Sequence, residues 1–457
     1  MGNACASEVI GQPGGPFFAR GDPHPRATLP SGPGAFPDHW KEPLVKIIDI
    51  KVAVIGERPD DPDAFDTHCS PIVRIVTDAG IDGYGQVESS KPYLKPHILY
   101  YRDALIGMDP TDVERCMLRI RRRGSFKPWG ASVSAIEMAL WDVAGKAANL
   151  PVHKLLGGKV RDKVRVYNGN VRFPLRDQSP EAYAENMQMM KESPEGFTII
   201  KQGVSYHSGM PNSVPNFAYS YDRVDDPSRG GFAGSRGLLT EQGLNHIIRC
   251  VEAMKKVTGE SIGLALDCGP GWTIPDAIRF GRAMEPHNIM WIEDILTGDY
   301  VPWVNASAYR EVTQATSTPV HTGEQIYLRH HFKELFEKQA VRVVGPDPAD
   351  VGGLAELKWV AEYADLHGIL MAPHGTLDGV IGLAGLVQVS AALPHNFIAF
   401  EYPVARPSWW YDIVDGLPDP IVKDGFIDVW DRPGLGVTFR VDEARKRLHA
   451  SDKGFFD

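Results

Sequence analysis

The chain of 457 residues is long enough for a large barrel domain together with a second domain. Hydrophobic residues make up 43% and charged residues 23%, as in ordinary soluble globular proteins. The formal net charge of −10 argues against a nucleic-acid partner, because phosphate backbones attract basic surfaces, but it leaves an acidic small-molecule substrate possible. No apolar run approaches the roughly 18–20 residues of a membrane helix, so we expect no membrane partner.

The cysteines indicate a reducing compartment. They are odd in number and lack CxxC spacing, which disfavours a disulfide framework. The five are Cys5, Cys69, Cys116, Cys250 and Cys268. The start, MGNACASEV, is similar to an N-myristoylation signal but has Ala6 where the pattern requires Ser or Thr, and no secretory apolar region follows. We therefore predict a cytoplasmic protein.

The N-terminal third predicts an arm followed by an α+β domain. Residues 1–41 are rich in Gly and Pro, as in GQPGGP and LPSGPGAFP, which is typical of a flexible arm. Within residues 42–160, VKIIDIKVAVI and SPIVRIVTDAGIDGYGQVE alternate like strands, the second with a turn at residues 78–80. The stretch ASVSAIEMALWDVAGKAAN has apolar residues at helical spacing.

Residues 161–402 repeat a strand–helix pattern. The expected strands are VRVYN, FTIIK, IGLALD, IMWIE, TPVHTGE, VRVVGPD, GILMAPH and NFIAFE. Most of the gaps hold an amphipathic helix, for example LAELKWVAEYADLHG, so the fold class is α/β and the architecture a (β/α)₈ TIM barrel. Residues 204–238 are too long and too rich in Gly, Pro and Ser for a plain connector, and such insertions often serve as lids or interface segments.

Three consecutive barrel strands end in a carboxylate. The third strand ends at Asp267, the fourth at Glu293 and the fifth at Glu324. Active sites of such barrels lie at the carboxyl ends of the strands, where three acids would repel one another without a cation. Mg²⁺ prefers oxygen ligands, so this pattern predicts a magnesium site. Each acid taken alone could instead be a helix N-cap or a surface charge.

The next strand ends supply acid–base groups. The sixth strand gives Asp347, the seventh His374 and the eighth Glu401. A carboxylate beside His374 would raise its basicity and fix its tautomer, so the pair predicts proton transfer, although a single loop histidine can be structural. Glu401 either hydrogen-bonds a substrate carboxylate or only closes the barrel. Lys201, at the end of FTIIK, would neutralise charge on a bound substrate or act as a base; the alternative is a structural ion pair with Asp267 or Asp294.

Several motifs together resemble the enolase superfamily, in its mandelate racemase and muconate lactonizing branch. They are SAIEMALWDVAGK, LALD, WIED, TGEQ, GPDPADVGG, APHG and DRPGLGV, and they extend over about residues 45–440. The resemblance implies a modified (β/α)₇β barrel, an α+β capping domain completed by residues 403–457, and one Mg²⁺ per subunit with an enediolate intermediate. It assigns the metal ligands to Asp267, Glu293 and Glu324, the His–Asp dyad to His374 and Asp347, and the late-strand Glu to Glu401.

One departure from the family pattern bears on the reaction. Many members carry Lys-x-Lys at the second strand, whereas this chain reads KQG, with Gly203 at the second Lys position. Some sugar-acid dehydratases place a base at the position of Gly269. His374 is then the clear remaining acid–base group, and one such group suffices when it abstracts the α-proton and returns it to a leaving 3-hydroxyl. The chain resembles sugar-acid dehydratases of the rhamnonate type.

We therefore predict a Mg²⁺-dependent hydro-lyase that converts a sugar acid into a 2-keto-3-deoxy acid. The alternatives are a racemase, epimerase or cycloisomerase of the same superfamily, or a sugar-acid-binding protein without activity. Substrate contacts are expected from the cap at residues 63–90, from the loop RRRGSFKPWG and from the insertion; the candidates, each of which can equally be an ordinary surface residue, are His68, Lys127, Trp129 and His207. His207 could also replace the missing base if the insertion folds over the barrel mouth. The expected partners are a small-molecule carboxylate and further copies of the chain in a homo-oligomer.

Overall fold

The computed structural model describes residues 45–57, 70–88, 93–124, 130–169, 174–219, 238–296, 304–375, 379–404 and 406–457. The chain divides into two units, Met1–Glu42 and Pro43–Asp457, and every described residue belongs to the second unit. Within this described part, no helix has the length and apolar character that a membrane crossing requires.

The first elements form a three-stranded antiparallel sheet covered by helices. The strands are β1 (Ile47–Ile55), β2 (Ser70–Thr77) and β3 (Gly83–Gln86), in the order β1-β2-β3. The helices are α1 (Leu94–Tyr100), α2 (Arg102–Leu105), α3 (Val113–Arg123), α4 (Gly130–Ala148) and α5 (Val152–Leu155). Helix α4 lies tightly on β3, since a Cβ at Gly85 would stand 1.9 Å from the carbonyl oxygen of Ala135.

A ring of parallel strands follows. The strands are β4 (Lys163–Gly169), β5 (Ile199–Gly203), β6 (Gly263–Asp267), β7 (Ile292–Glu293), β8 (Val320–Thr322), β9 (Val343–Val344), β10 (Leu370–Met371) and β11 (Phe400–Pro403). Strands β5 to β10 form one parallel sheet in sequential order, and β11 pairs in parallel with β4. Hydrogen bonds between Ile398 N and Met371 O and between Glu401 N and Pro373 O join β10 to β11. At the other seam, the Asn168 side chain pairs with both backbone groups of Lys201.

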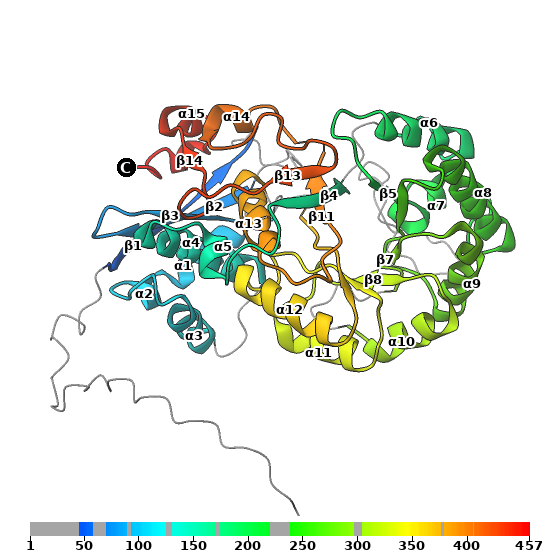
Figure 1. Cartoon of the computed structure of the whole chain (residues 1–457), viewed down its shortest axis with the longest axis horizontal. Coiled ribbons are helices and arrows are strands. Elements are labelled where there is room, and N and C mark those ends of the chain that lie inside the picture. Colours follow the sequence, from blue (N-terminus) through cyan, green and yellow to red (C-terminus); the bar gives the residue numbers. More distant parts are fainter. Residues whose placement is uncertain are drawn as a thin grey trace, which may run out of the picture. The chain divides into compact units, whose positions relative to one another are not determined.

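A long helix lies in each connection between successive strands of this ring. These helices are α6 (Pro180–Lys191), α8 (Glu241–Thr258), α9 (Ile274–Met284), α10 (Ala306–Ala315), α11 (Arg329–Glu337), α12 (Leu354–Leu366) and α13 (Gly379–Ala391). Several begin where the sequence supplies an N-cap; for example, Ser179 Oγ accepts from Ala182 N and Thr240 Oγ1 accepts from Gly243 N. Figure 1 shows α6 and α8 to α11 following the outside of the strand ring. The predicted (β/α)₇β architecture is confirmed within the described residues.

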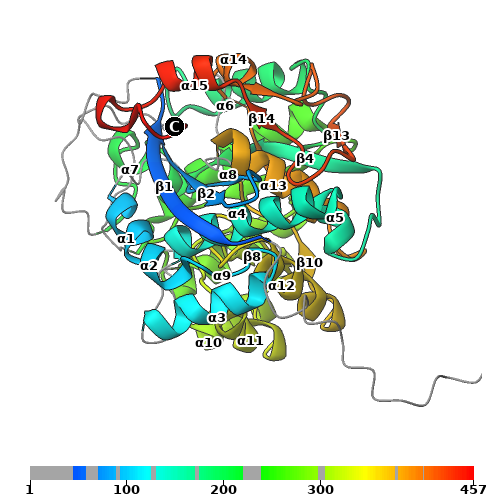
Figure 2. The same ribbon diagram turned by 90° about the vertical axis from the view of Figure 1, so that its left-hand side faces the viewer.

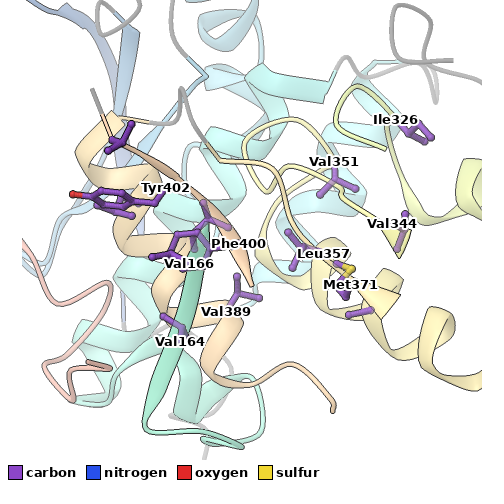
Figure 3. Close-up of a cluster of buried hydrophobic side chains, with 14 of the residues drawn as sticks. Val164, Val166, Ile326, Val344, Val351, Leu357, Met371, Val389, Phe400 and Tyr402 are labelled. Carbon is purple, nitrogen blue, oxygen red and sulfur yellow. The ribbon is translucent and has the colours of Figure 1, made fainter. Parts of the chain in front are cut away.

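The barrel has an inner and an outer apolar core. The inner cluster takes buried side chains from the strands and from residues directly beside them, namely Tyr167, Ile199, Ala265, Trp291, Val343, Ala372 and Ala399. The outer cluster lies between strands and helices: Figure 3 shows Val166 of β4 and Phe400 of β11, which are register partners, beside Val389 of α13. Layers filled in this way make the barrel a packed core rather than a pore, so chemistry is confined to its rim.

The segment after β11 returns to the first sheet. Its elements are α14 (Trp410–Ile413), β12 (Val414–Asp415), β13 (Phe426–Asp428), β14 (Thr438–Phe439), α15 (Val441–Lys446) and the 3₁₀ helix η5 (Ala450–Asp452). Leu448 bridges to Ile55 of β1, and Val54 N donates to Asp452 Oδ2 at 3.0 Å. Figure 2 shows the C-terminus beside β1. Strand β13 instead pairs with β4 of the barrel, so this segment joins both parts of the molecule.

Part of the insertion at 204–238 is described. It contains the 3₁₀ helix η2 (Ser205–His207), α7 (Met210–Ser213) and a bridge from Ala218 to Leu239, while residues 220–237 lie outside the described residues. A second 3₁₀ helix, η3 (Glu285–His287), follows α9. Tyr206 packs edge-on against Phe217 and Trp272, and all three are buried. This aromatic contact fixes the start of the insertion on the rim between β5 and β6.

Candidate active site

The residues predicted at the strand ends meet on one rim of the barrel. Lys201 lies in β5, Asp267 ends β6, Glu293 ends β7 and Glu401 lies in β11. The other three follow their strands by two or three residues, and they are Glu324 after β8, Asp347 after β9 and His374 after β10. All are buried except Glu324, which is partly buried. The contacts below join them into a single cluster.

Lys201 connects three carboxylates. Its Nζ lies 2.6 Å from Glu293 Oε1, 3.1 Å from Glu401 Oε1 and 3.2 Å from Asp267 Oδ2. Burial alone would lower the pKa of Lys201, but Glu293, Glu401 and Asp267 hold it well above its usual value. The ammonium is therefore a permanent positive charge. The pairing foreseen with Asp267 is present as part of a larger network.

Glu293 is the most strongly held of the carboxylates. Its Oε2 accepts from Trp291 Nε1 at 2.7 Å and lies 3.6 Å from His321 Nδ1, while Oε1 faces Lys201. Burial raises the pKa of Glu293, yet Lys201 and His321 outweigh it and lower this pKa to about 2. Trp291 and His321 were missed from the sequence. Their signal is visible in IMWIE and TPVHTGE, where a side chain with a polar ring nitrogen stands two or three residues before the carboxylate.

Glu293 also belongs to a group of oxygens with metal-ligand spacing. One oxygen each from Glu293, Asp294 and Glu324 lie within 4.8 Å of one another. Asp294 has a left-handed backbone, with φ of 55°, directly after the end of β7. This group shares two members with the predicted ligand set, and it contains Asp294 where the sequence predicted Asp267. Asp267 instead faces Lys201 through Oδ2 and His207 through Oδ1.

The histidine at the end of the seventh strand is paired as expected for a dyad. His374 Nδ1 lies 2.5 Å from Asp347 Oδ2, and Asp347 Oδ1 accepts from Ala349 N at 2.6 Å. The other ring nitrogen, Nε2, lies 3.5 Å from Glu324 Oε2 and 3.6 Å from Glu401 Oε2. Burial would lower the pKa of His374, but Glu324, Glu401 and Asp347 raise it well above its usual value. The imidazole therefore presents Nε2 to the carboxylate cluster.

Glu401 lies between the lysine and the histidine. One oxygen contacts Lys201 and the other faces His374 Nε2. Burial raises the pKa of Glu401 to about 7, partly opposed by Lys201 and His374. Near neutral pH this carboxyl group can thus carry a proton and donate a hydrogen bond, which fits the first of the two roles foreseen for it.

His207 lies on the same rim, above β5 and β6. Its Nδ1 is 3.2 Å from Asp267 Oδ1, and its side chain keeps 36% of its exposure. A Cβ at Gly203 would stand 2.7 Å from the His207 carbonyl oxygen, and a Cβ at Gly269 would stand 2.9 Å from the His207 Cβ. His207 therefore occupies the space over Gly203 and Gly269.

Three of the predicted substrate contacts are not placed. His68, Lys127 and Trp129 lie outside the described residues. The ends of the loop that carries Lys127 and Trp129 are described: Arg121 Nη2 contacts Glu356 Oε1 at 2.7 Å, and Gly130 packs on the backbone of Asp350.

Comparison with known proteins places this rim in a family. Residues 184–444 match the model described as "Enolase C-terminal domain-like", and residues 64–157 match "Mandelate racemase / muconate lactonizing enzyme, N-terminal domain". The chain belongs to the enolase superfamily. Its barrel and its first α+β part correspond to the two halves of the mandelate racemase and muconate lactonizing branch.

Curated relatives within the enolase superfamily include named dehydratases. D-xylonate dehydratase of Haloferax volcanii is 31% identical over 82% of this chain and 85% of its own length. D-mannonate dehydratase CC0532 of Caulobacter vibrioides is 29% identical over 88% of this chain and 95% of its own length. Among solved structures, a mandelate racemase/muconate lactonizing enzyme-like protein from Rubrobacter xylanophilus aligns with a TM-score of 0.74 at 30% identity, covering 88% of this chain and 97% of the other.

Proposed function

We propose that this member of the enolase superfamily is a Mg²⁺-dependent hydro-lyase that dehydrates a sugar acid to a 2-keto-3-deoxy acid. The observation that carries the proposal is that His374 Nε2 faces Glu324, a carboxylate that also belongs to the oxygen group formed with Glu293. An acid–base group and a candidate cation site thus border the same space. The relatives named as dehydratases of D-xylonate and D-mannonate support this substrate class.

The side chains on the rim fit a hard divalent cation. Glu293, Asp294 and Glu324 offer carboxylate oxygens, the donors that Mg²⁺ prefers, and Asp267 lies next to Glu293 around Lys201. The cluster holds more carboxylates than the cations of Lys201 and His374 balance, and burial raises the pKa of Glu324. We propose Asp267, Glu293 and Glu324 as the ligands, with Asp294 as the alternative to Asp267. Bound there, Mg²⁺ would supply a Lewis acid for the substrate carboxylate.

Lys201 and Glu401 prepare the site for an anionic substrate. The Lys201 ammonium is fixed by three carboxylates, so it offers a positive charge on the β5 flank without reorganisation during the reaction. Glu401, whose pKa is raised to about 7 by burial, can donate a hydrogen bond to a carboxylate oxygen of the substrate when it is protonated. Both groups stabilise the negative charge that develops on that carboxylate during the reaction.

His374 moves the protons. The carboxylates that raise the pKa of His374 include Glu324, and a cation bound to Glu324 would oppose this effect and favour the neutral ring. Asp347 holds Nδ1, which fixes the tautomer and leaves Nε2 of the neutral ring to take the proton from the substrate carbon next to the carboxylate. The C3–O bond then breaks, and the leaving hydroxide takes a proton from His374 to depart as water. The resulting enol becomes the 2-keto acid by protonation at C3. A single imidazole completes this sequence when the α-proton and the 3-hydroxyl lie on the same side.

The position of His207 supports a second candidate function, epimerisation at the α-carbon. Epimerisation requires proton transfer on both faces of that carbon, and His207 lies above β6, whereas His374 follows β10. As a substrate contact, His207 would bind a hydroxyl group of the sugar acid on that side. The two reactions differ in product and can be told apart directly.

The test is a screen of sugar acids with the full-length enzyme and Mg²⁺ in D₂O. Dehydration predicts release of a 2-keto acid that carries deuterium at C3. Epimerisation predicts deuterated substrate and its epimer without keto acid. If neither product forms from any sugar acid while the protein binds them, the chain is a sugar-acid-binding protein and the proposal is wrong.

The choice between Asp267 and Asp294 can be tested without turnover. Asp267→Asn and Asp294→Asn each remove one negative charge from neighbouring positions, so each variant is the control for the other. We expect Asp267→Asn to weaken Mg²⁺ binding, measured by calorimetry, about 10- to 100-fold, and Asp294→Asn to weaken it less. The reverse order would assign the third ligand to Asp294.

We also propose the partners, the oligomeric state and the compartment of the protein. The reaction takes a small-molecule carboxylate as its partner and needs neither nucleic acid nor a membrane. We propose a homo-oligomer in the cytoplasm, which light scattering of the purified chain and fractionation of its cells would test.

A further inference from the structure

The loop between β9 and α12, residues 345–353, is held by side chains from helix α4 of the first α+β part. Ser134 Oγ accepts from Gly352 N at 2.9 Å. Glu137 Oε2 accepts from Leu354 N at 2.7 Å, and Glu137 Oε1 accepts from Ala355 N at 3.0 Å. The two Glu137 contacts satisfy the first backbone donors of α12, which a helix cannot satisfy itself. A carboxylate from one part of the molecule thus begins a helix in the other.

The contact between Glu137 and the start of α12 is buried and closely packed. Glu137 is 2% exposed, and its Oε1 also accepts from Trp141 Nε1 at 2.6 Å. Gly353 has φ of 112°, and a Cβ there would stand 2.1 Å from Glu137 Oε2. Only glycine leaves room for the carboxylate at this distance. A buried acid whose two oxygens both accept from fixed N–H groups defines the position of those groups closely.

The same loop orients the dyad carboxylate. The Asp347 carbonyl oxygen accepts from Val351 N at 2.7 Å and from Asp350 N at 3.1 Å. Its Oδ1 accepts from Ala349 N at 2.6 Å, which leaves Oδ2 for His374. The direction of the Asp347 side chain therefore depends on the path of residues 349–351. That path ends at the backbone groups that Ser134 and Glu137 hold.

A second carboxylate ties the start of α12 to neighbouring helices. Glu356, which is 3% exposed, accepts from Arg329 Nε at 2.7 Å and from Arg329 Nη2 at 2.9 Å, and Arg121 of α3 contacts its Oε1 at 2.7 Å. Arg121 and Glu137 come from different helices of the first α+β part. Two independent contacts thus fix the same turn of α12.

We propose that Glu137 is a positioning residue for the His374–Asp347 pair, acting through the backbone of residues 347–355. The inference rests on the proposed function, since it gives that pair a catalytic task. Helix α4 would then contribute to the reaction without touching the substrate. The signature stretch SAIEMALWDVAGK contains both Ser134 and Glu137, so its polar residues acquire a role beyond packing.

Asp142 provides a matched control on the same helix. It is also 2% exposed and also accepts from backbone donors, from Tyr84 N at 2.9 Å and from Leu435 N at 2.8 Å. None of these partners belongs to residues 345–357. Glu137→Gln and Asp142→Asn each place an amide donor where only donors approach, and Asp142→Asn also breaks the ion pair of Asp142 Oδ2 with Lys146 Nζ at 2.6 Å, so both should lower stability. Only the first should disturb the dyad loop.

The experiment compares the full-length wild-type protein with these two variants. Amide hydrogen exchange read by mass spectrometry should rise in peptides covering residues 345–357 and around His374 for Glu137→Gln, and around residues 83–86 and 435 for Asp142→Asn. With the sugar acid identified in the screen, kcat of Glu137→Gln should fall about 10- to 100-fold while KM stays unchanged. The rate at which the α-proton is exchanged in D₂O should fall by the same factor. Asp142→Asn should keep the wild-type kcat well below its melting temperature.

Two results would overturn the inference: unchanged exchange at residues 345–357 in Glu137→Gln, or equal losses of kcat in both variants. Should Glu137→Gln fail to fold, Ser134→Ala removes the neighbouring contact to Gly352, and it must then show the same local exchange and the same loss of kcat. If the wild-type enzyme turns over no sugar acid, the proposed function fails. The hydrogen-exchange comparison still decides whether Glu137 fixes the loop.

Discussion

The two flanks of the barrel rim carry similar acids in different electrostatic states. On the flank of β5 to β7, Lys201 contacts Asp267 and Glu293, and the pKa of Glu293, although raised by burial, falls to about 2 because Lys201 and His321 outweigh that effect. On the flank of β8 to β10, Glu324 faces the ring of His374, and burial raises its pKa although His374 and Lys201 oppose this effect. One flank has a permanent cation, and the other has a titratable one.

This difference shows where a further positive charge is needed. A buried carboxylate without a cation gains a proton instead, which would remove it as a ligand and as an electrostatic partner. Glu324 faces the ring of His374, but the oxygens of Glu293 and Asp294 also lie next to it. A divalent cation at this point would neutralise the carboxylates on the flank of β8 to β10. The rim can then bind an anionic substrate although it consists mainly of acids.

Among the changes that test the two flanks, removal of the metal should reduce turnover most. We expect turnover to fall to background when a chelator removes the metal. A cation that neutralises the substrate carboxylate stabilises the transition state by several kcal/mol. Addition of Mg²⁺ should restore turnover. The measurement is keto-acid release before and after dialysis against a chelator, with atomic absorption to verify the metal content. Full activity of the stripped enzyme would contradict both the metal site and the role given to Glu324.

His374→Asn should come next in size. The amide cannot exchange a proton with the substrate carbon, so kcat should fall about 1000-fold or more, while Mg²⁺ binding by calorimetry stays intact. His367→Asn, at the far end of α12, is the control and should keep its activity. Near-normal turnover by His374→Asn would show that the proton is taken elsewhere on the rim.

Lys201→Met tests the permanently charged flank. Removing the ammonium leaves Asp267, Glu293 and Glu401 without their shared cation, so the metal-free protein should lose about 3 to 5 kcal/mol in urea unfolding. Added Mg²⁺ should return part of that stability. Lys159→Met is the control, because the Lys159 partners Asp162 and Asp431 are 90% and 61% exposed and such a pair contributes at most about 1 kcal/mol. Equal losses in the two variants would contradict the network.

His207→Ala should have the smallest effect. If His207 only binds a substrate hydroxyl group, KM should rise about tenfold with kcat nearly unchanged, as expected for one lost hydrogen bond. Ser208→Ala, beside it in the chain, serves as the comparison. Loss of exchange at the α-carbon on one face only would instead favour epimerisation.

Much of the fold follows from local patterns. The eight expected strands are all present, because each combines a short apolar run with a turn or helix signal on either side. The residue that ends a parallel strand lies on the same rim as those ending its neighbours, so the meeting of Asp267, Glu293 and Glu401 could be foreseen. The same reasoning brought His374 and Asp347 together from adjacent strands.

Other features depend on the path of the chain between these elements. Asp294 enters the oxygen group through the left-handed turn after β7, which strand periodicity does not reveal. His207 reaches Asp267 because a short 3₁₀ helix, anchored by aromatic packing, folds back over two glycines. Trp291 and His321 are buried in the barrel and are also partners of Glu293, which strand periodicity does not reveal.

The sequence by itself determined the order of strands and helices, the acids and the histidine at the strand ends, and the family to which they belong, since these depend on local spacing and on residue type. The tertiary structure decided which acids share Lys201, where His207 lies, and that Glu137 begins a helix more than 200 positions along the chain. Those contacts join distant segments. Their energies depend on burial and on distances of a few ångströms, which no local pattern encodes.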